Sequence, residues 1–382
     1  MTVERDGTAW LSLLEELVNT DSAPGDHTGI EAVYSRLVPV LDRLGLSVRQ
    51  RATDGGPSVL VARRSGSRTH RSRVLMVGHV DTVFDRGTAQ ARPFRMAGER
   101  AFGPGVADMK GGLVVMLAAL SELGEDAWDG LDLTMVFNGD EESGSPFSRP
   151  VIEEMATGRD AALVFEAARP SGAVVTSRRG VARYRLDVTG RASHSGSNPG
   201  AGANALETLA HKILGIQQLG RDVDRATVNV VLADGGTRPN IIPPVASVHV
   251  DARFDDEAER TVERGLQALA GPGPVEGTTT QVTRYGGRPA FPRPFDWLAG
   301  EYVDAAKTLG LRIETVAAGG VSDANFTAAL GVPTLDGLGP SGGGAHTDDE
   351  YIEVASLAER ASACAVLLSR LARPRAAPGD QR

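Results

Sequence analysis

The chain has 382 residues, a length that accommodates two ordinary domains. It carries 40 basic and 49 acidic residues, and the net charge of −9 argues against a nucleic-acid partner. Its first residues lack the pattern of a secretory signal, and no apolar run approaches the roughly 18 residues of a membrane span, so we expect no membrane partner.

The first part of the chain alternates between helix and strand patterns. Helices are predicted over residues 10–19, 28–44 and 111–123, and strands over 58–63, 73–79, 131–138 and 161–166. This alternation predicts an α/β fold with a mainly parallel sheet that has helices on both faces.

The order of elements changes near residue 178. The next elements are a strand (181–189), a helix (203–219), two strands (226–233, 246–254), a helix (256–270) and a strand (278–285). This is the split β-α-β-β-α-β arrangement. After the Pro-rich segment 289–294 the first pattern resumes, with a helix over 295–309, a strand over 312–316 and a final helix over 353–372.

We therefore expect a small α+β domain, residues 178–290, inserted into a larger domain that comprises residues 1–177 and 291–372. The last residues, 373–382, look like a frayed tail. The only cysteine, Cys364, lies in the final helix pattern and can form no internal disulfide. A single unpaired cysteine is typical of a reducing compartment, which predicts a cytoplasmic protein.

Apolar runs of the larger domain end in histidine or acidic residues. Open α/β sheets place their sites at the carboxyl ends of strands, and the glycines beside these residues allow tight loops. Imidazole and carboxylate groups together suit two metal ions, zinc first, with manganese or cobalt as alternatives. The residues concerned are His79, Asp81, Asp108, Glu141, Glu142, Glu166 and His346.

Each of these residues alone also has a simpler interpretation. Asp108 precedes a helix and has the residue type of an N-cap. Residues 140–142 read alone as a solvated acidic turn, and Glu166 as a strand-end carboxylate. Four other histidines lack such settings and are interpreted as structural or solvated, namely His27, His70, His211 and His249. The occurrence of all these residues together is much less likely by chance than that of any one of them.

Nine segments of the chain stand in the order of one known family. The chain resembles the di-zinc aminoacylase and carboxypeptidase family of amide hydrolases, and within it the glutamate carboxypeptidases of the carboxypeptidase G type. The resemblance runs from about residue 70 to residue 372 and implies a zinc-exopeptidase fold. The segments are GHVDTVF, PFR, AFGPGVADMKGG, VFNGDEESGS, GRASHSG, RPNIIP, VDARF, GRPAF and AHTDDEYI.

The resemblance implies a dinuclear metal site. Asp108 matches the carboxylate that bridges both ions. His79 and Glu166 match the remaining ligands of one ion. Glu142 and His346 match those of the other ion.

The resemblance also implies the groups around the metals. Asp81 matches the residue that fixes the tautomer of His79, and Glu141 matches the general base. A cis peptide bond is implied between Asp108 and Met109.

The implied reaction is hydrolysis of an amide bond that releases a C-terminal amino acid, glutamate or a similar one, from an N-acyl or peptidyl substrate. Arg253 and Asn240 match positions that hold the substrate carboxylate, and Arg288 matches one that favours an acidic leaving side chain. The segment AARPSGAVV after Glu166 lacks the lysine of the glutamate-releasing members, and Arg169 is a candidate to replace it. The alternative is a biosynthetic deacylase that removes acetyl or succinyl groups.

The inserted domain carries one further candidate. His194 in GRASHSG matches a histidine that reaches the active site of the partner subunit, which predicts a homodimer joined through residues 178–290. Two other classes stay open at this point. Residues 339–343, GPSGG, fit the G-x-S-x-G pattern of serine hydrolases around Ser341, and a non-catalytic relative would keep the fold with an inactive site.

Overall fold

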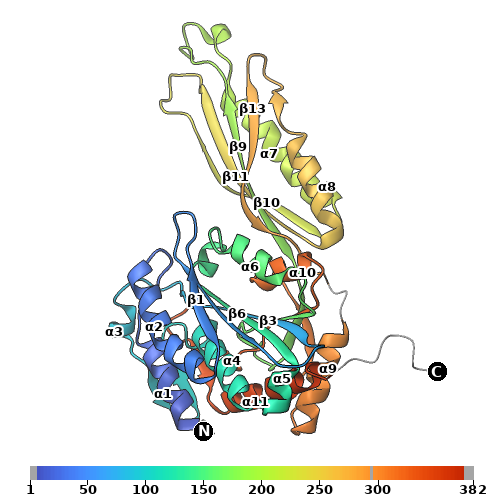
Figure 1. Cartoon of the computed structure of the whole chain (residues 1–382). Helices are drawn as coiled ribbons and strands as arrows, with labels where there is room; N and C mark the ends of the chain where they lie inside the picture. The colour runs from blue at the N-terminus through green and yellow to red at the C-terminus, as the bar shows by residue number, and fades with distance from the viewer. Residues whose placement is uncertain (1–6, 293–295, 374–382) are drawn as a thin grey trace, which may run out of the picture. The chain divides into compact units, whose positions relative to one another are not determined.

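The computed structural model describes residues 7–292 and 296–373, so the predicted tail lies outside the described residues except for its first residue (Figure 1). The chain forms two units. The described part of the first unit comprises residues 7–177, 296–318 and 322–373. The second unit comprises residues 178–292 and 319–321. No described helix combines the length and apolar character needed to cross a membrane.

The first unit contains a six-stranded mixed sheet. β3 pairs in parallel with β6 and with β7, and β7 pairs in parallel with β15, whereas β1–β2 and β2–β6 are antiparallel. The predicted mainly parallel α/β sheet is therefore confirmed. The strands, in sheet order, are β1 (Ser47–Arg51), β2 (Val59–Ser65), β6 (Leu131–Asn138), β3 (Ser72–His79), β7 (Ala161–Val164) and β15 (Thr334–Leu335).

Helices cover both faces of this sheet (Figure 1). The central helix, α4 (Gly111–Ser121), has no polar face, and nearly all of its residues are buried. It shares the main core with α1 (Gly7–Val18), α2 (His27–Arg43), α9 (Asp296–Thr308) and α11 (Ala355–Leu371). On the opposite face lie α6 (Arg149–Ala156) and α10 (Ala324–Ala329).

Shorter elements complete the first unit. A small sheet has the order β16 (Gly342–Gly343), β17 (Tyr351–Glu353), β5 (Arg100–Phe102) and β4 (Arg95–Ala97). A second small pair joins β14 (Thr315–Ala318) to β8 (Val174–Arg178). Two short helices are α3 (Thr88–Ala91) and α5 (Glu125–Asp129).

The second unit has the β-α-β-β-α-β order that the sequence predicts, with one additional two-residue strand, β12, before the last strand. Its antiparallel sheet has the order β10-β11-β9-β13-β12. Along β11 buried residues alternate with more exposed ones, and the buried ones pack with the two helices into a separate core. The elements are β9 (Gly180–Thr189), α7 (Ala205–Asp222), β10 (Ala226–Gly235), β11 (Val245–Phe254), α8 (Asp256–Gln267), β12 (Gly271–Pro272) and β13 (Thr279–Arg288).

Candidate active site

The predicted metal ligands meet at one edge of the sheet of the first unit. His79 is the last residue of β3, and Glu166 follows the neighbouring strand β7 by two residues. Glu142 lies in a 3₁₀ turn, Glu141–Ser143, that follows β6 on the other side of β3. Parallel neighbours end at the same edge, so these three side chains converge.

Asp108 lies between the two histidines of the cluster. Its Oδ1 is 3.1 Å from Nε2 of His79, and its Oδ2 is 3.1 Å from Nε2 of His346. A π-helical turn, Val106–Lys110, presents it, and the peptide bond to Met109 is cis, as the resemblance implies. The N-cap of α4 is Lys110, so the interpretation of Asp108 as a simple helix cap is wrong.

Each histidine also faces a second carboxylate. Nε2 of His79 is 3.8 Å from Oε2 of Glu166, and Nε2 of His346 is 3.4 Å from Oε2 of Glu142. Glu141 belongs to the same cluster, because one of its oxygens lies within 4.8 Å of ligand atoms of His79 and Glu166. Glu141, as well as the predicted ligands, is therefore close enough to the cluster to contact a metal ion bound there.

Burial and neighbouring charges shift the pKa values of the acids and histidines of this cluster. Burial raises the pKa of Glu166 well above its usual range, and the charge of Asp108 adds to the effect. Hydrogen bonds to Asp108 and Glu142 raise the pKa of His346 to about 10. A divalent cation supplies positive charge at the same place, so the electrostatics of the cluster fit one.

The donor atoms also fit a metal. Oε1 of Glu142 is buried and has no hydrogen-bond partner among the described residues, which leaves a carboxylate oxygen available inside the cluster. Such an atom costs free energy unless an ion or a donor satisfies it. Imidazole and carboxylate ligands are those that zinc, cobalt and manganese take.

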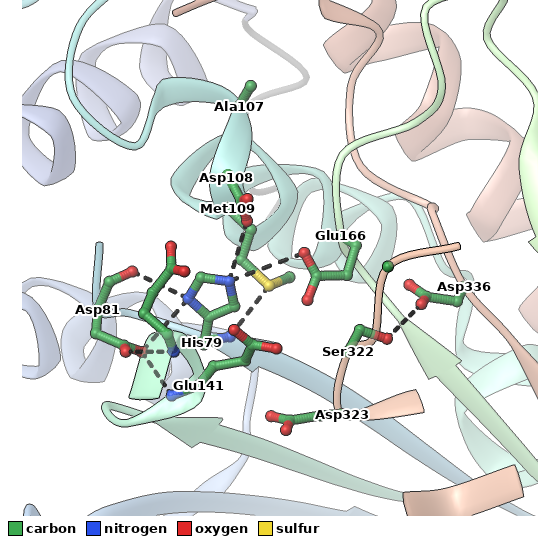
Figure 2. A network of polar contacts seen from close by, with 12 residues as sticks. His79, Asp81, Ala107, Asp108, Met109, Glu141, Glu166, Ser322, Asp323 and Asp336 are labelled. Carbon is green, nitrogen blue, oxygen red and sulfur yellow. Dashed lines mark hydrogen bonds and ion pairs between the residues drawn. The ribbon is translucent and has the colours of Figure 1, made fainter. Parts of the chain in front are cut away.

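Asp81 connects the histidine to the acidic turn (Figure 2). Nδ1 of His79 is 3.0 Å from the backbone oxygen of Asp81 and 3.4 Å from its Oδ1. A proton on Nδ1 leaves Nε2 to face the cluster. The Asp81 carboxylate accepts the backbone N–H groups of Glu141 and Glu142 at 3.2 and 2.9 Å.

Close backbone packing fixes the far side of the cluster. A Cβ atom on Gly112, in the first turn of α4, would lie 1.9 Å from the carbonyl oxygen of Phe165. Only glycine allows this approach. The contact joins the segment that carries Asp108 to the residue just before Glu166.

A buried polar network beneath the acidic turn was not predicted from the sequence. Asp323, just before α10, accepts hydrogen bonds from Nδ2 of Asn138 at 2.8 Å and from Oγ of Ser145 at 2.5 Å. Ser322 donates to Asp336 at 2.6 Å (Figure 2). No motif in the sequence marks Asp323, and its position is evident only from its distant partners Asn138 and Ser145.

The alternative interpretation of Ser341 as the nucleophile of a serine hydrolase is wrong. The backbone N–H of Ser341 donates to Oγ of Ser356 at 2.9 Å, and the next two residues form the strand β16. A nucleophile elbow requires a helix directly after the serine.

The other predicted site residues belong to the second unit, and within it they form two pairs. Nδ1 of the exposed His194 accepts N–H groups of Gly196 and Ser197 at 3.1 Å each, so its proton resides on Nε2. The N–H of Ser195 donates to the carbonyl oxygen of Asn240 at 3.0 Å, which places Asn240 beside His194.

Arg253 and Arg288 form the second pair, because both lie opposite Val181 in the sheet. The guanidinium of Arg253 contacts both carboxylate oxygens of Asp251 at 2.8 and 3.3 Å, and Arg288 is buried.

The two pairs lie near opposite ends of β11. His194 and Asn240 flank the end where Val245 faces Thr189, whereas Arg253 is eight residues further along the strand. Eight residues of strand span about 26 Å. One chain's second unit therefore does not offer all four residues to one small molecule.

Comparisons with known proteins identify the family of this chain. The family model described as peptidase family M20/M25/M40 matches residues 75–370. The chain belongs to this family. The predicted resemblance is therefore confirmed, and the protein is an enzyme of the M20 metallopeptidase and amidohydrolase family.

Three curated relatives have different names. Carboxypeptidase G2 of Pseudomonas sp. (strain RS-16) is 33% identical over 382 residues, with 95% of this chain and 89% of that protein covered. A putative succinyl-diaminopimelate desuccinylase of Mycobacterium tuberculosis is 30% identical, with 75% and 79% covered. Acetylornithine deacetylase of Vibrio cholerae is 26% identical, with 64% and 68% covered.

Solved structures agree with the fold. Aminopeptidase PepT from Bacillus cereus has a TM-score of 0.76 at 23% identity, with 96% of this chain and 99% of that chain covered. The M20 family metallo-carboxypeptidase Sso-CP2 from Sulfolobus solfataricus has a TM-score of 0.73 at 17% identity, with 95% and 99% covered.

Proposed function

We propose that this M20 enzyme uses two divalent metal ions, zinc first, to hydrolyse an amide bond and release a C-terminal amino acid, glutamate or a similar one. The observation that carries the proposal is Asp108, whose two carboxylate oxygens each face a different histidine at 3.1 Å. The 33% identity to carboxypeptidase G2 over 95% of this chain supports the class of reaction.

Five side chains would hold the two ions. Asp108 would bridge them, His79 and Glu166 would complete one site, and Glu142 and His346 the other, as their present pairing supports. Bound there, the ions would polarise a water molecule and stabilise the negative charge of the transition state.

Glu141 would be the general base. It takes a proton from the attacking water and returns one to the leaving nitrogen. The hydrogen bond from its backbone N–H to Asp81 holds it in the cluster without using its carboxylate. Its neighbour Glu142 instead points an oxygen at His346, so two adjacent acids serve different purposes.

The substrate carboxylate would bind a guanidinium group of the second unit. Arg253 offers a planar pair of donors, which now contacts Asp251, and a substrate carboxylate would compete for them. Asn240 and Arg288 are further candidates for substrate contacts. Arg169, half-buried in the turn after Glu166, is a candidate for the absent lysine.

A homodimer would complete each active site. The second unit exposes an edge strand, β10, on which Val231 and Leu232 are 53% and 64% exposed, and Leu214 of α7 is 66% exposed. A long apolar edge of this kind favours pairing with another chain. The separation of His194 from Arg253 along β11 supports a role for His194 in the partner's site, where its Nε2–H would face the developing oxyanion.

A second candidate is removal of an acyl group from an amino acid in biosynthesis. Two relatives are named for desuccinylation and deacetylation, and the segment after Glu166 departs from the glutamate-releasing pattern. The same cluster would hydrolyse either bond, so only the groups beyond it separate the two candidates. We place either enzyme in the cytoplasm, in agreement with the single buried cysteine.

The test is a substrate panel of N-acyl amino acids and dipeptides on the zinc-loaded protein. The released amino acid and the released acyl acid are measured, with and without a chelator. Chelator-sensitive release of glutamate from peptidyl or N-acyl glutamate supports the carboxypeptidase proposal. A preference for acetyl or succinyl groups on other amino acids supports the second candidate. Full activity in the thoroughly metal-free protein would overturn both.

A further inference from the structure

Glu350 is a buried carboxylate that the proposed reaction does not use. It is only 1% exposed and lies four residues after His346 in the segment AHTDDEY. Its Oε1 accepts the backbone N–H groups of Ala107 and Asp108 at 2.8 and 2.9 Å. Its Oε2 accepts the N–H of Gly105 at 2.9 Å.

These three N–H groups belong to the turn that presents Asp108. Gly105 has a φ of 72°, and the dihedral angles at Asp108 are not helical. The N–H of Lys110 bonds within the turn, to the carbonyl oxygen of Gly105, whereas those of Gly105, Ala107 and Asp108 donate to Glu350. Successive backbone N–H groups that point to one side form an anion-binding concavity. Glu350 fills this concavity from within the chain, and its three hydrogen bonds offset part of the cost of burying it.

The segment that carries Glu350 therefore contacts the same turn twice. Glu350 holds the backbone N–H of Asp108, and His346 faces the side chain of Asp108. The position of one proposed bridging carboxylate is thus tied to the position of the second histidine. A shift of the turn would move Oδ1 and Oδ2 relative to both imidazoles.

We infer that Glu350 is a positioning residue for the metal centre, which fixes the turn 105–108 so that each oxygen of Asp108 faces its own histidine. The inference rests on the proposed function, because it assigns Asp108 to the bridge. A residue that only stabilised the fold would alter the melting temperature of the metal-free protein and leave metal affinity unchanged.

Glu350→Gln is the informative variant. Glutamine has the same length, but it offers one acceptor oxygen and places an NH₂ group against the remaining N–H donors. A matched control is Asp21→Asn, because Asp21 also accepts two backbone N–H groups, those of Gly87 and Ala89 at 2.7 and 2.8 Å. Within the described residues, the hydrogen bonds of Asp21, Gly87 and Ala89 involve no proposed metal ligand.

The experiment measures zinc affinity of metal-free wild type, Glu350→Gln and Asp21→Asn by competition with a chromophoric chelator, and records the visible spectra of the cobalt forms. We expect the Kd of at least one ion to rise about 10–100-fold in Glu350→Gln, with an altered cobalt spectrum, as for other groups that orient metal ligands. Asp21→Asn should keep both Kd values within about twofold. A folded Glu350→Gln with wild-type Kd values and spectrum would overturn the inference.

A second measurement covers a variant that is too unstable for titration. The melting temperature is recorded without metal and with saturating zinc, for Glu350→Gln and for the shorter Glu350→Asp. At a fixed zinc concentration the stabilisation by bound zinc grows with the logarithm of its affinity for the folded state, so weaker binding gives a smaller rise in melting temperature. A smaller zinc-induced rise than in wild type supports the inference, and an unchanged rise contradicts it. Wild type that binds two ions but hydrolyses no amide would instead count against the proposed function alone.

Discussion

The carboxylate of Asp81 accepts a hydrogen bond from the backbone N–H of Glu142, with 2.9 Å between Oδ2 and the nitrogen. The N–H of Glu141 reaches the other oxygen at 3.2 Å. The backbone oxygen of Asp81 also lies 3.0 Å from Nδ1 of His79. Asp81 thus joins the end of β3 to the turn after β6, in addition to fixing the tautomer of His79.

Asp81→Asn should therefore weaken metal binding and slow turnover together. Asparagine keeps one acceptor oxygen but turns an NH₂ group toward the backbone of Glu141 or Glu142. We expect metal affinity to fall about 10–100-fold, measured by chelator competition. Asp26→Asn is the control, because Asp26 caps α2 through the N–H of Gly29 and asparagine is an equally good N-cap, so metal affinity and stability should both stay close to wild type. Equal metal affinity in the two variants would contradict the prediction.

Glu141→Gln and Glu142→Gln should separate base from ligand. Glu141→Gln should keep two ions and lose about 10²–10⁴-fold in kcat, the range typical of a general base. Glu142→Gln should lose metal as well, because its carboxylate faces His346. Elemental analysis and kcat at saturating zinc test both. Near-normal turnover of Glu141→Gln would remove it from the base role.

Arg253→Lys should weaken substrates that carry a free α-carboxylate and spare their amides and esters. Lysine cannot reproduce the paired contact of a guanidinium with a carboxylate. Arg183→Lys is the control, since Arg183 also approaches Asp251, at 3.7 Å, but is not among the predicted substrate contacts. The comparison is kcat/KM for each acid and its amide. Equal losses on both substrate types would exclude Arg253 from carboxylate binding.

Co-expression of Glu141→Gln and His194→Ala chains should restore activity if His194 acts in the partner subunit. In a mixed dimer the His194→Ala chain keeps Glu141 and receives an intact His194 from its partner. Random pairing gives about half mixed dimers with one good site of two, so about a quarter of wild-type activity should return. Mixed dimers that are present but inactive would place His194 in its own chain's site.

Cys364 should be inert in the native protein. Burial raises the pKa of its thiol to about 12, so at pH 8 almost no thiolate is present. We expect no reaction with a thiol reagent at pH 8 until the protein is unfolded. Because the folded pKa lies above the unfolded value, its contribution to stability is full below about pH 8.5 and decreases as the pH rises toward 12. Rapid labelling of the native protein would contradict this.

Long helices and strands were predictable from the sequence because their hydrophobic patterns extend over many residues. The strand that ends in His79 and the wholly apolar helix α4 both have enough residues to show their type. The two-residue strands β15 and β16 have no period to detect. The predicted strand over 312–316 is found at Thr315–Ala318, because nothing local fixes so short a strand.

Some residues of the candidate site were likewise predictable from the sequence and others were not. His79 and Glu166 were predictable because each follows an apolar run, which the sequence displays directly. Glu350 and Asp323 were not, since each acts through partners more than 170 residues away, namely Asp108 and Ser145. The separation of Asn240 from Arg253 could not be predicted from the sequence either, because it follows from the pairing register of β11.

The order of the chain also determines when the cluster can close during synthesis. His79, Asp108, Glu142 and Glu166 precede the second unit, whereas His346 and Glu350 follow it. A nascent chain therefore exposes three carboxylates and one imidazole while more than 100 further residues are still being made. Until the last tenth of the chain emerges, Asp108 has neither its second histidine nor the carboxylate that holds its turn.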